Sequence, residues 1–311
     1  MHLKFIFNCI LILLIVGVLK TDIKAQQLTV ATYNLRNDNP SNDDSLRGNG
    51  WKQRLPIIAG LIQFHDFDIF GTQEGLFHQL GNLKDAMPEY VYTGIGRDDG
   101  KTEGEYSAIF YKRTKFKLLS HGNFWMSEIT DKPNKGWDAV LPRICSWGSF
   151  QEIKTGFKFY FFNLHMDHIG VVARRKSAEL VLEKIKAIAK NAPVILTGDF
   201  NVDQTSDSYA VINNSGTLKD AYELSTLKYA TNGTFNDFNA DNKTDSRIDH
   251  IFLSKRFKAK RYGILTDSYR APSSSKSEKT TSGNFPKEVV LQKYTTKLPS
   301  DHFPVMVVVN Y

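Results

Sequence analysis

Cysteine is almost absent from this 311-residue chain, which contains only Cys9 and Cys145. Cys9 lies in an apolar N-terminal segment with the features of a removable export signal, so the mature chain would keep a single cysteine. An internal disulfide is then excluded, and the stability of the fold must come from its apolar core. Cys145 lies in a strand-like run, where we expect a buried thiol without a nucleophilic role.

Several other patterns are missing. The sequence has no cysteine cluster and no HExxH histidine pair, which disfavours a structural or catalytic zinc site. Beyond the N-terminus, no apolar run approaches the roughly 20 residues that a membrane-spanning helix needs. It also lacks internal repeats and long linkers, which favours one domain. A composition of 41% hydrophobic and 23% charged residues is typical of a globular protein.

The N-terminal segment predicts export. Lys4 precedes an uninterrupted small and apolar run over residues 10–19, and Ala25 stands at the predicted cleavage point. The run is short for a membrane anchor, and Cys9 lacks the small residues that follow a lipid-modified cysteine. We therefore expect a signal peptide over residues 1–25, a mature domain over residues 26–311, and a periplasmic or extracellular location.

Positive charge is in small excess. Removal of residues 1–25 would lower the formal net charge from +7 to +5. Such a surplus only weakly favours anionic partners, because surface lysines also serve solubility. Nucleic acid therefore stays open as a partner, beside smaller phosphate esters, and we expect a monomer.

Alternating apolar patterns predict a protein of strands and helices. Residues 28–36, a helix from Trp51 and a strand over residues 68–72 form a strand, helix, strand unit, and another helix follows at residues 76–87. Residues 171–192 give the clearest helical pattern in the chain. The stretch 269–287 is of low complexity and predicts a mobile surface loop. Further strands are expected at residues 106–113, 116–126, 143–153, 157–166, 194–201, 246–254 and 303–311.

Polar side chains recur where these strands begin or end. In a sheet protein such positions can converge on one edge, where α/β proteins build their sites. A turn, a helix cap or a hydrogen-bonded Asp–His pair would explain each cluster alone, but six together favour one shared site. The clusters are Asn34; Gln73 with Glu74; Asn163 with His165 and Asp167; Asp199 with Asn201; Asp249 with His250; and Asp301 with His302.

These residue types suit a hard divalent cation. Mg²⁺ prefers oxygen ligands and takes one or two carboxylates beside a substrate phosphate, a role that fits Glu74 and Asp301. Histidines interspersed with carboxylates suit cleavage of phosphate esters, because imidazolium and metal stabilise charge that grows on the phosphoryl oxygens.

The motifs "TYNLR", "GTQE", "LHMDH", "TGDFN", "RIDHIFLS" and "SDHFPV", in this order, resemble the endonuclease/exonuclease/phosphatase superfamily. The resemblance extends over about residues 28–311, and "GWDAVLPRICSW" and "LHMDHIG" are closest to its nocturnin-like and secreted bacterial branch. It implies an α/β fold, a four-layer αββα sandwich of two packed mixed sheets flanked by helices. It also implies a metal-dependent phosphoric ester hydrolase.

The resemblance further implies a role for each matching position. Glu74 would be the principal ligand of Mg²⁺, or of Mn²⁺ in its place, with Asn34 and Asp301 beside it. His302 would donate to the scissile phosphate, and Asp249 would fix its tautomer. His250 would be structural. The other catalytic residues would be Asp199, which orients or deprotonates the attacking water; Asn201, which holds that water or a phosphate oxygen; and His165, which contacts the phosphate or assists the leaving group.

Arg36 departs from the pattern of some DNA-repair members, which carry an acidic residue there. Arg36, Arg143 and Asp167 are candidates for substrate binding, and Arg143 could grip a terminal phosphate with two hydrogen bonds. The favoured function is an exported Mg²⁺-dependent phosphatase or phosphodiesterase in which water attacks phosphorus in line, without a covalent enzyme intermediate. The alternatives are a secreted nuclease and a non-catalytic binding module on the same fold.

Overall fold

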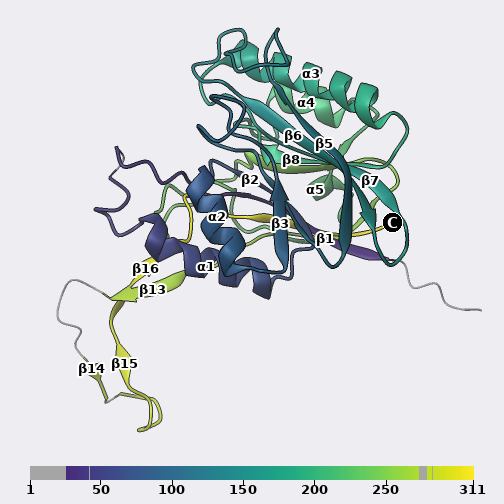
Figure 1. Ribbon diagram of the computed structural model, residues 1–311. Coiled ribbons are helices and arrows are strands. Elements are labelled where there is room, and N and C mark those ends of the chain that lie inside the picture. Colours follow the sequence, from purple (N-terminus) through teal and green to yellow (C-terminus); the bar gives the residue numbers. More distant parts are fainter. Residues whose placement is uncertain (1–25, 42, 273–278, 282) are drawn as a thin grey trace, which may run out of the picture.

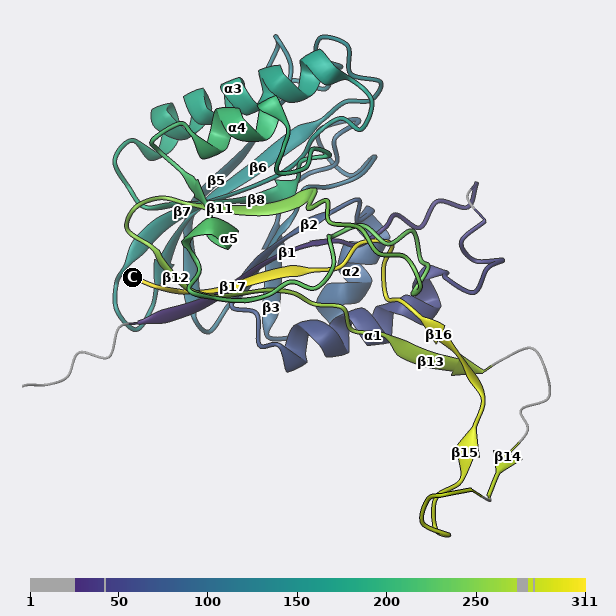
Figure 2. The ribbon, with the colours of Figure 1, turned by 180° about the vertical axis from the view of Figure 1, so that it is seen from behind.

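A computed structural model describes residues 26–41, 43–272, 279–281 and 283–311. Two β-sheets pack face to face, and helices cover the outer face of each, as Figures 1 and 2 show. This arrangement confirms the predicted four-layer sandwich. The predicted signal peptide over residues 1–25 lies outside the described residues. Within those residues, no helix is both long enough and apolar enough to cross a membrane.

One sheet has seven strands in the order β10-β12-β17-β1-β2-β4-β3. It is mixed, because β1 pairs with β17 antiparallel and with β2 parallel. The last strand in the sequence therefore lies beside the first, at the centre of the sheet. The strands are β1 (Gln27–Asn34), β2 (Ile69–Gln73), β3 (Tyr90–Thr93), β4 (Ile109–Lys112), β10 (Leu227–Tyr229), β12 (Lys258–Ile264) and β17 (Val305–Asn310).

The other sheet has six strands in the order β5-β6-β7-β8-β11-β9. Its only parallel pair is β7 and β8, which a crossover helix connects. The strands are β5 (Phe116–Trp125), β6 (Ile144–Glu152), β7 (Lys158–His165), β8 (Val194–Asp199), β9 (Lys219–Asp220) and β11 (Asp249–Leu253).

Helices α1 (Trp51–Phe64) and α2 (Phe77–Ala86) cover the seven-stranded sheet, and α3 (Val171–Ala189) and α4 (Asp207–Asn213) cover the six-stranded one (Figure 1). The three longest helices, α1, α2 and α3, confirm the sequence predictions. In α3, Ala178, Val181 and Ile185 recur at helical spacing and are buried, so one face of the helix packs on the sheet. A short helix, α5 (Ala221–Leu224), lies between β9 and β10 in the sequence.

Strand alternation creates three separate cores, one between the sheets and one under each helical layer. In β1, Leu28 and Val30 face the other sheet, whereas Ala31 and Tyr33 face the helices. Cys145 of β6 belongs to the core under α3 and is fully buried, and burial raises the pKa of its thiol. This matches the inert thiol that we expected.

A layer of buried polar side chains continues the core between the sheets towards one edge. Asn163 of β7 donates from its amide to two backbone oxygens of the seven-stranded sheet, those of Thr72 and Ala108, both at 2.9 Å. Its side-chain oxygen accepts from Gln73 at 2.7 Å and from Thr197 at 3.0 Å. These hydrogen bonds satisfy every buried group of the amide and fix how the two sheets face each other.

The predicted loop at 269–287 takes a different form where the structure describes it. Strand β13 (Tyr269–Pro272) pairs with β16 (Tyr294–Lys297), and β14 (Lys279–Thr280) pairs with β15 (Leu291–Gln292). Together they form an arm that projects from the sandwich (Figures 1 and 2). Sequence composition missed these ladders because the paired strands are short and 21 residues, 273–293, separate β13 from β16.

Gly71 of β2 provides a test of the polar layer. A Cβ atom on Gly71 would lie 2.1 Å from the side-chain oxygen of Asn163, which its hydrogen bonds hold in place. We expect Gly71→Ala to lower the free energy of unfolding by at least about 2 kcal/mol, measured by urea denaturation. Gly60→Ala is the matched control. That position of α1 faces open space, so the change should raise stability by about 0.5 kcal/mol, and equal effects of the two changes would contradict this account.

Candidate active site

A cavity of about 410 Å³ opens at the edge where β1, β7 and β8 end and where β11 begins. The polar layer between the sheets therefore leads directly into its floor. Both sheets contribute, because Glu74, Asp301 and His302 follow or precede strands of the seven-stranded sheet and His165 and Asp199 end strands of the other. The lining residues are Arg36, Asn37, Glu74, Glu105, Leu141, Arg143, His165, His168, Asp199, Asn201, Phe235, Asp237, Asp301 and His302.

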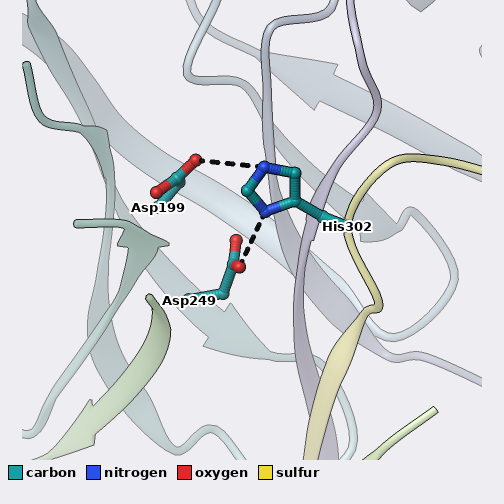
Figure 3. A group of neighbouring side chains, drawn as sticks. All are labelled: Asp199, Asp249 and His302. Atoms are coloured by element: carbon teal, nitrogen blue, oxygen red, sulfur yellow. Dashed lines mark hydrogen bonds and ion pairs between the residues drawn. The ribbon is translucent and has the colours of Figure 1, made fainter. Parts of the chain in front are cut away.

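His302 lies between two carboxylates (Figure 3). Its Nδ1 is 2.9 Å from Oδ2 of Asp249, and its Nε2 is 3.8 Å from Oδ2 of Asp199. A carboxylate only accepts, so Nδ1 carries a proton and Nε2 is left to face the cavity. Burial opposes the charged imidazole, but Asp249 and Asp199 outweigh it and raise the pKa of His302 well above its ordinary value. His302 is therefore a cationic donor.

Asn34 holds two of the site's carboxylates in place. Its Nδ2 donates to Oε1 of Glu74 and to Oδ2 of Asp199, both at 3.0 Å, and its Oδ1 accepts from the backbone of Arg36. Asn34 is not among the residues that line the cavity, and its role as a metal ligand stays a prediction. In this arrangement it positions Glu74 and Asp199 relative to each other.

Four non-glycine residues at the cavity have left-handed backbones: Arg36 (φ 56°), Glu74 (φ 63°), Asn201 (φ 51°) and Asp237 (φ 54°). Two of these turns are stabilised in the same way. The backbone of Arg36 donates to Asn34, and that of Asn201 donates to Oδ1 of Asp199 at 2.9 Å. These two turns place the side chains of Arg36 and Asn201 on the cavity wall. Conformations of this kind concentrate at functional sites, because the surrounding structure must hold them.

A second histidine has a contrasting environment. Nδ1 of His165 is 3.6 Å from Glu105, and its Nε2 is 3.6 Å from Asp199. Burial and then the charges of Arg143 and Arg97 lower the pKa of His165 well below its ordinary value. His165 is therefore neutral where His302 is charged, a division that suits acid–base chemistry at one site.

Arg143 forms one wall of the cavity. Its Nε donates to Asp167 at 3.2 Å, and one of its terminal nitrogens lies 2.8 Å from Nδ1 of His168. Asp167 is buried behind Arg143 and also accepts from the backbones of Ile169 and Gly170. It does not line the cavity, so its position supports the orientation of Arg143 rather than direct contact with a ligand.

Known proteins identify the family of this chain. Residues 31–302 match the Endonuclease/Exonuclease/phosphatase family. The chain belongs to the endonuclease/exonuclease/phosphatase family. Members of this family are hydrolases of phosphate esters, and the fold is that of deoxyribonuclease I.

Solved structures of the family place the chain beside bacterial relatives. A mannosyl-6-phosphatase of Bacteroides thetaiotaomicron is 55% identical and covers 91% of this chain and 100% of its own, with a TM-score of 0.84. A family protein of Bacteroides vulgatus is 36% identical, with coverage of 92% and 99% and a TM-score of 0.78. The human nocturnin catalytic domain shares the fold at 18% identity, with coverage of 91% and 93% and a TM-score of 0.63.

Five carboxylates line the cavity of this family member, and their crowding suits a hard divalent cation. Burial and the charge of Glu74 raise the pKa of Asp301 to about 6 and that of Glu105 to about 7. Burial and Asp249 raise the pKa of Asp199 to about 7. A bound cation would relieve this repulsion, and an oxygen-rich donor set is the one that such ions prefer.

Asp199, Asp249 and His302 also offer ligand atoms within 4.8 Å of one another (Figure 3). A metal ion among these three is disfavoured, because the proton on Nδ1 of His302 already occupies the space towards Asp249. Glu74 and Asp301 lie on the cavity wall and remain the better candidates for metal ligands.

Other residues predicted for the site lie at the cavity or next to it. Arg36, Arg143 and Asn201 line the cavity, and Asp249 lies behind His302. His250 points away from the cavity, and its Nε2 lies 3.0 Å from the backbone oxygen of Val202. Five lining residues were not predicted from the strand ends: Asn37, Glu105, Leu141, Phe235 and Asp237.

The pair of Asp249 and His302 can be tested without a substrate. We expect Asp249→Asn to lower the pKa of His302 by about one pH unit or more in metal-free protein, because an opposing charge disappears. NMR titration of the ring protons measures this pKa, with His302→Gln to assign the signal. Asp85→Asn, an exposed change on α2, is the control, and an unchanged His302 pKa in Asp249→Asn would refute the pairing.

Proposed function

We propose that this chain is an exported, Mg²⁺-dependent phosphatase that hydrolyses a small soluble phosphate ester, and that Mn²⁺ can replace Mg²⁺. The observation that carries the proposal is the cationic His302, held by Asp249 and Asp199 on the same cavity as Glu74 and Asp301. The 55% identical mannosyl-6-phosphatase supports a phosphorylated sugar as the first substrate to test. N-terminal sequencing and light scattering of exported protein test the cleavage after Ala25 and the expected monomer.

Each of these residues has a separate role in the proposed reaction. Asp199, whose pKa of about 7 leaves part of it ionised at neutral pH, orients the attacking water and accepts its proton, and Asn201 holds that water or a phosphoryl oxygen. His302 donates to the phosphate from Nε2. Neutral His165 assists the leaving group. Glu74 and Asp301 would hold the cation, whose positive charge stabilises the charge that develops on the phosphoryl oxygens.

The distribution of charge disfavours long nucleic acid as the substrate. A nuclease needs unpaired cations beside its cavity, but Arg36 and Arg143 each pair with a carboxylate there. Six exposed cations lie around the turns before β7 and β8 and after β11, at the end of the sandwich away from the cavity. None of the six has an ion-pair partner among the described residues: Lys154, Lys158, Lys190, Lys255, Arg256 and Lys258.

Metal dependence gives one test. We expect EDTA to abolish hydrolysis of p-nitrophenyl phosphate and Mg²⁺ to restore it. Glu74→Gln should raise the Mg²⁺ concentration for half-maximal rate by at least about 10-fold, because it removes an anionic ligand. Glu89→Gln, an exposed change far from the cavity, should leave the titration unchanged. An unaltered Mg²⁺ titration in Glu74→Gln would exclude the assigned ligand.

A substrate panel gives another test. It covers mono- and bis-(p-nitrophenyl) phosphate, sugar phosphates, nucleotides, inositol phosphates, sphingomyelin, RNA and plasmid DNA. We expect the highest kcat/KM on a sugar phosphate, and a loss of at least about 10²-fold in turnover in His302→Ala and Asp199→Ala, since both groups stabilise the transition state. His121→Ala on the surface of β5 is the control. Faster cleavage of DNA would favour the nuclease, and folded protein without metal-dependent turnover would favour the binding module.

A further inference from the structure

Residues 234–237 form a short extra ladder against residues 301–303, which precede β17. Phe235 and His302 make an antiparallel bridge, and the backbone of Asn236 donates to the oxygen of Asp301 at 2.8 Å. The hydroxyl oxygen of Thr234 accepts from the backbones of Ile248 and Asp249 at 2.9 and 3.1 Å. The segment is thus bound to the backbone on both sides of the Asp249–His302 pair, which fixes its place at the cavity mouth.

This ladder places an aromatic ring beside the catalytic imidazole. The ring centroids of Phe235 and His302 are 5.1 Å apart, with an interplanar angle of 72°. Phe235 lines the cavity and yet is 41% exposed, so part of its ring is free to contact a ligand. Large aromatic rings are usually buried, and an exposed one on the wall of a polar cavity offers a flat apolar surface.

Asp237 follows on the same wall. It and Phe238 adopt consecutive left-handed conformations, with φ of 54° and 55°, and Asn236 accepts from the backbone of Phe238 at 2.8 Å to hold this turn. The guanidinium carbon of the buried Arg54 lies 5.5 Å from the ring centroid of Phe238 and stabilises the far side of this turn. Asp237 lines the cavity and is exposed, and its carboxylate makes no hydrogen bond or ion pair with the described residues.

We propose that Phe235 and Asp237 form a subsite for the leaving group that selects a neutral sugar ring esterified with phosphate. The proposal rests on the function proposed above and names the residues that set its substrate class. With the phosphate at His302, the next group outward meets Phe235 and Asp237. The ring of Phe235 packs against the C–H face of a pyranose, and Asp237 accepts hydrogen bonds from its hydroxyl groups.

The two side chains match a sugar better than the other ester classes. A sugar has one apolar face and a rim of hydroxyls, and a carboxylate accepts from such donors in charge-assisted bonds. The same carboxylate repels a leaving group that carries a second phosphate, such as a polynucleotide or a bisphosphate. Asp237 therefore acts both by attraction of the neutral sugar and by exclusion of polyanions.

Kinetics of three variants test the subsite. The three substrates are mannose 6-phosphate, glycerol 3-phosphate, which has no ring, and fructose 1,6-bisphosphate. We expect Phe235→Ala and Asp237→Asn each to raise KM for mannose 6-phosphate by about 10-fold with kcat little changed, because they remove ground-state contacts. Phe235→Ala should leave glycerol 3-phosphate within about 2-fold, and Phe235→Tyr should restore the sugar KM. Asp237→Asn should improve kcat/KM for the bisphosphate.

The controls are Asp241→Asn on the same exposed loop and Phe64→Ala on the surface of α1, and neither should alter KM. Equal losses on all three substrates, or an unchanged KM for mannose 6-phosphate, would overturn the subsite. Calorimetric binding of mannose 6-phosphate in EDTA separates this proposal from the hydrolase. Binding that Phe235→Ala and Asp237→Asn weaken, in a protein that shows no turnover even with Mg²⁺, would support the subsite and count against the hydrolase.

Discussion

The amide of Asn163 makes the contact on which the rest of the structure depends. It joins β7 to the backbone of the opposite sheet, and the residues that line the cavity are divided between those two sheets. The bonds from Asn34 to Asp199 and from His302 to Asp249 both cross this boundary. A sandwich held by apolar contacts alone could slide by a fraction of a residue at little cost, whereas a satisfied polar layer has one best alignment. The alignment of the sheets and the geometry of the site are thus one property.

The site concentrates charge that would be costly elsewhere. Buried carboxylates surround one cationic and one neutral imidazole, and the difference between His302 and His165 arises from their neighbours. His302 lies between two anions, while His165 lies under the influence of two guanidinium groups. Two side chains of the same type therefore differ in charge, as the separate parts proposed for them in the reaction require.

Much of the fold could be predicted from the sequence, because the strands and the longer helices have clear periodicity and the polar clusters follow them directly. Glu105 was missed although the same reasoning applies to it: it precedes β4, an antiparallel strand, just as Asp301 precedes β17. Phe235 and Asp237 left no such signal. They lie in a polar stretch without periodicity, and only the long-range ladder with residues 301–303 brings them to the cavity. The engaged amide of Asn34 and the buried position of Asp167 likewise depend on contacts that sequence spacing does not encode.

The position of β17 determines when the cavity can assemble during synthesis. This strand is the last in the sequence, yet it lies between β1 and β12 at the centre of its sheet, and Asp301 and His302 immediately precede it. Ser300 also closes a contact of 266 residues' separation by donating to the backbone oxygen of Asn34 at 2.7 Å. Contacts this distant form late, since the chain loses most entropy in closing them. During synthesis the growing polypeptide can therefore hold no assembled cavity before residues 300–310 have been joined and folded.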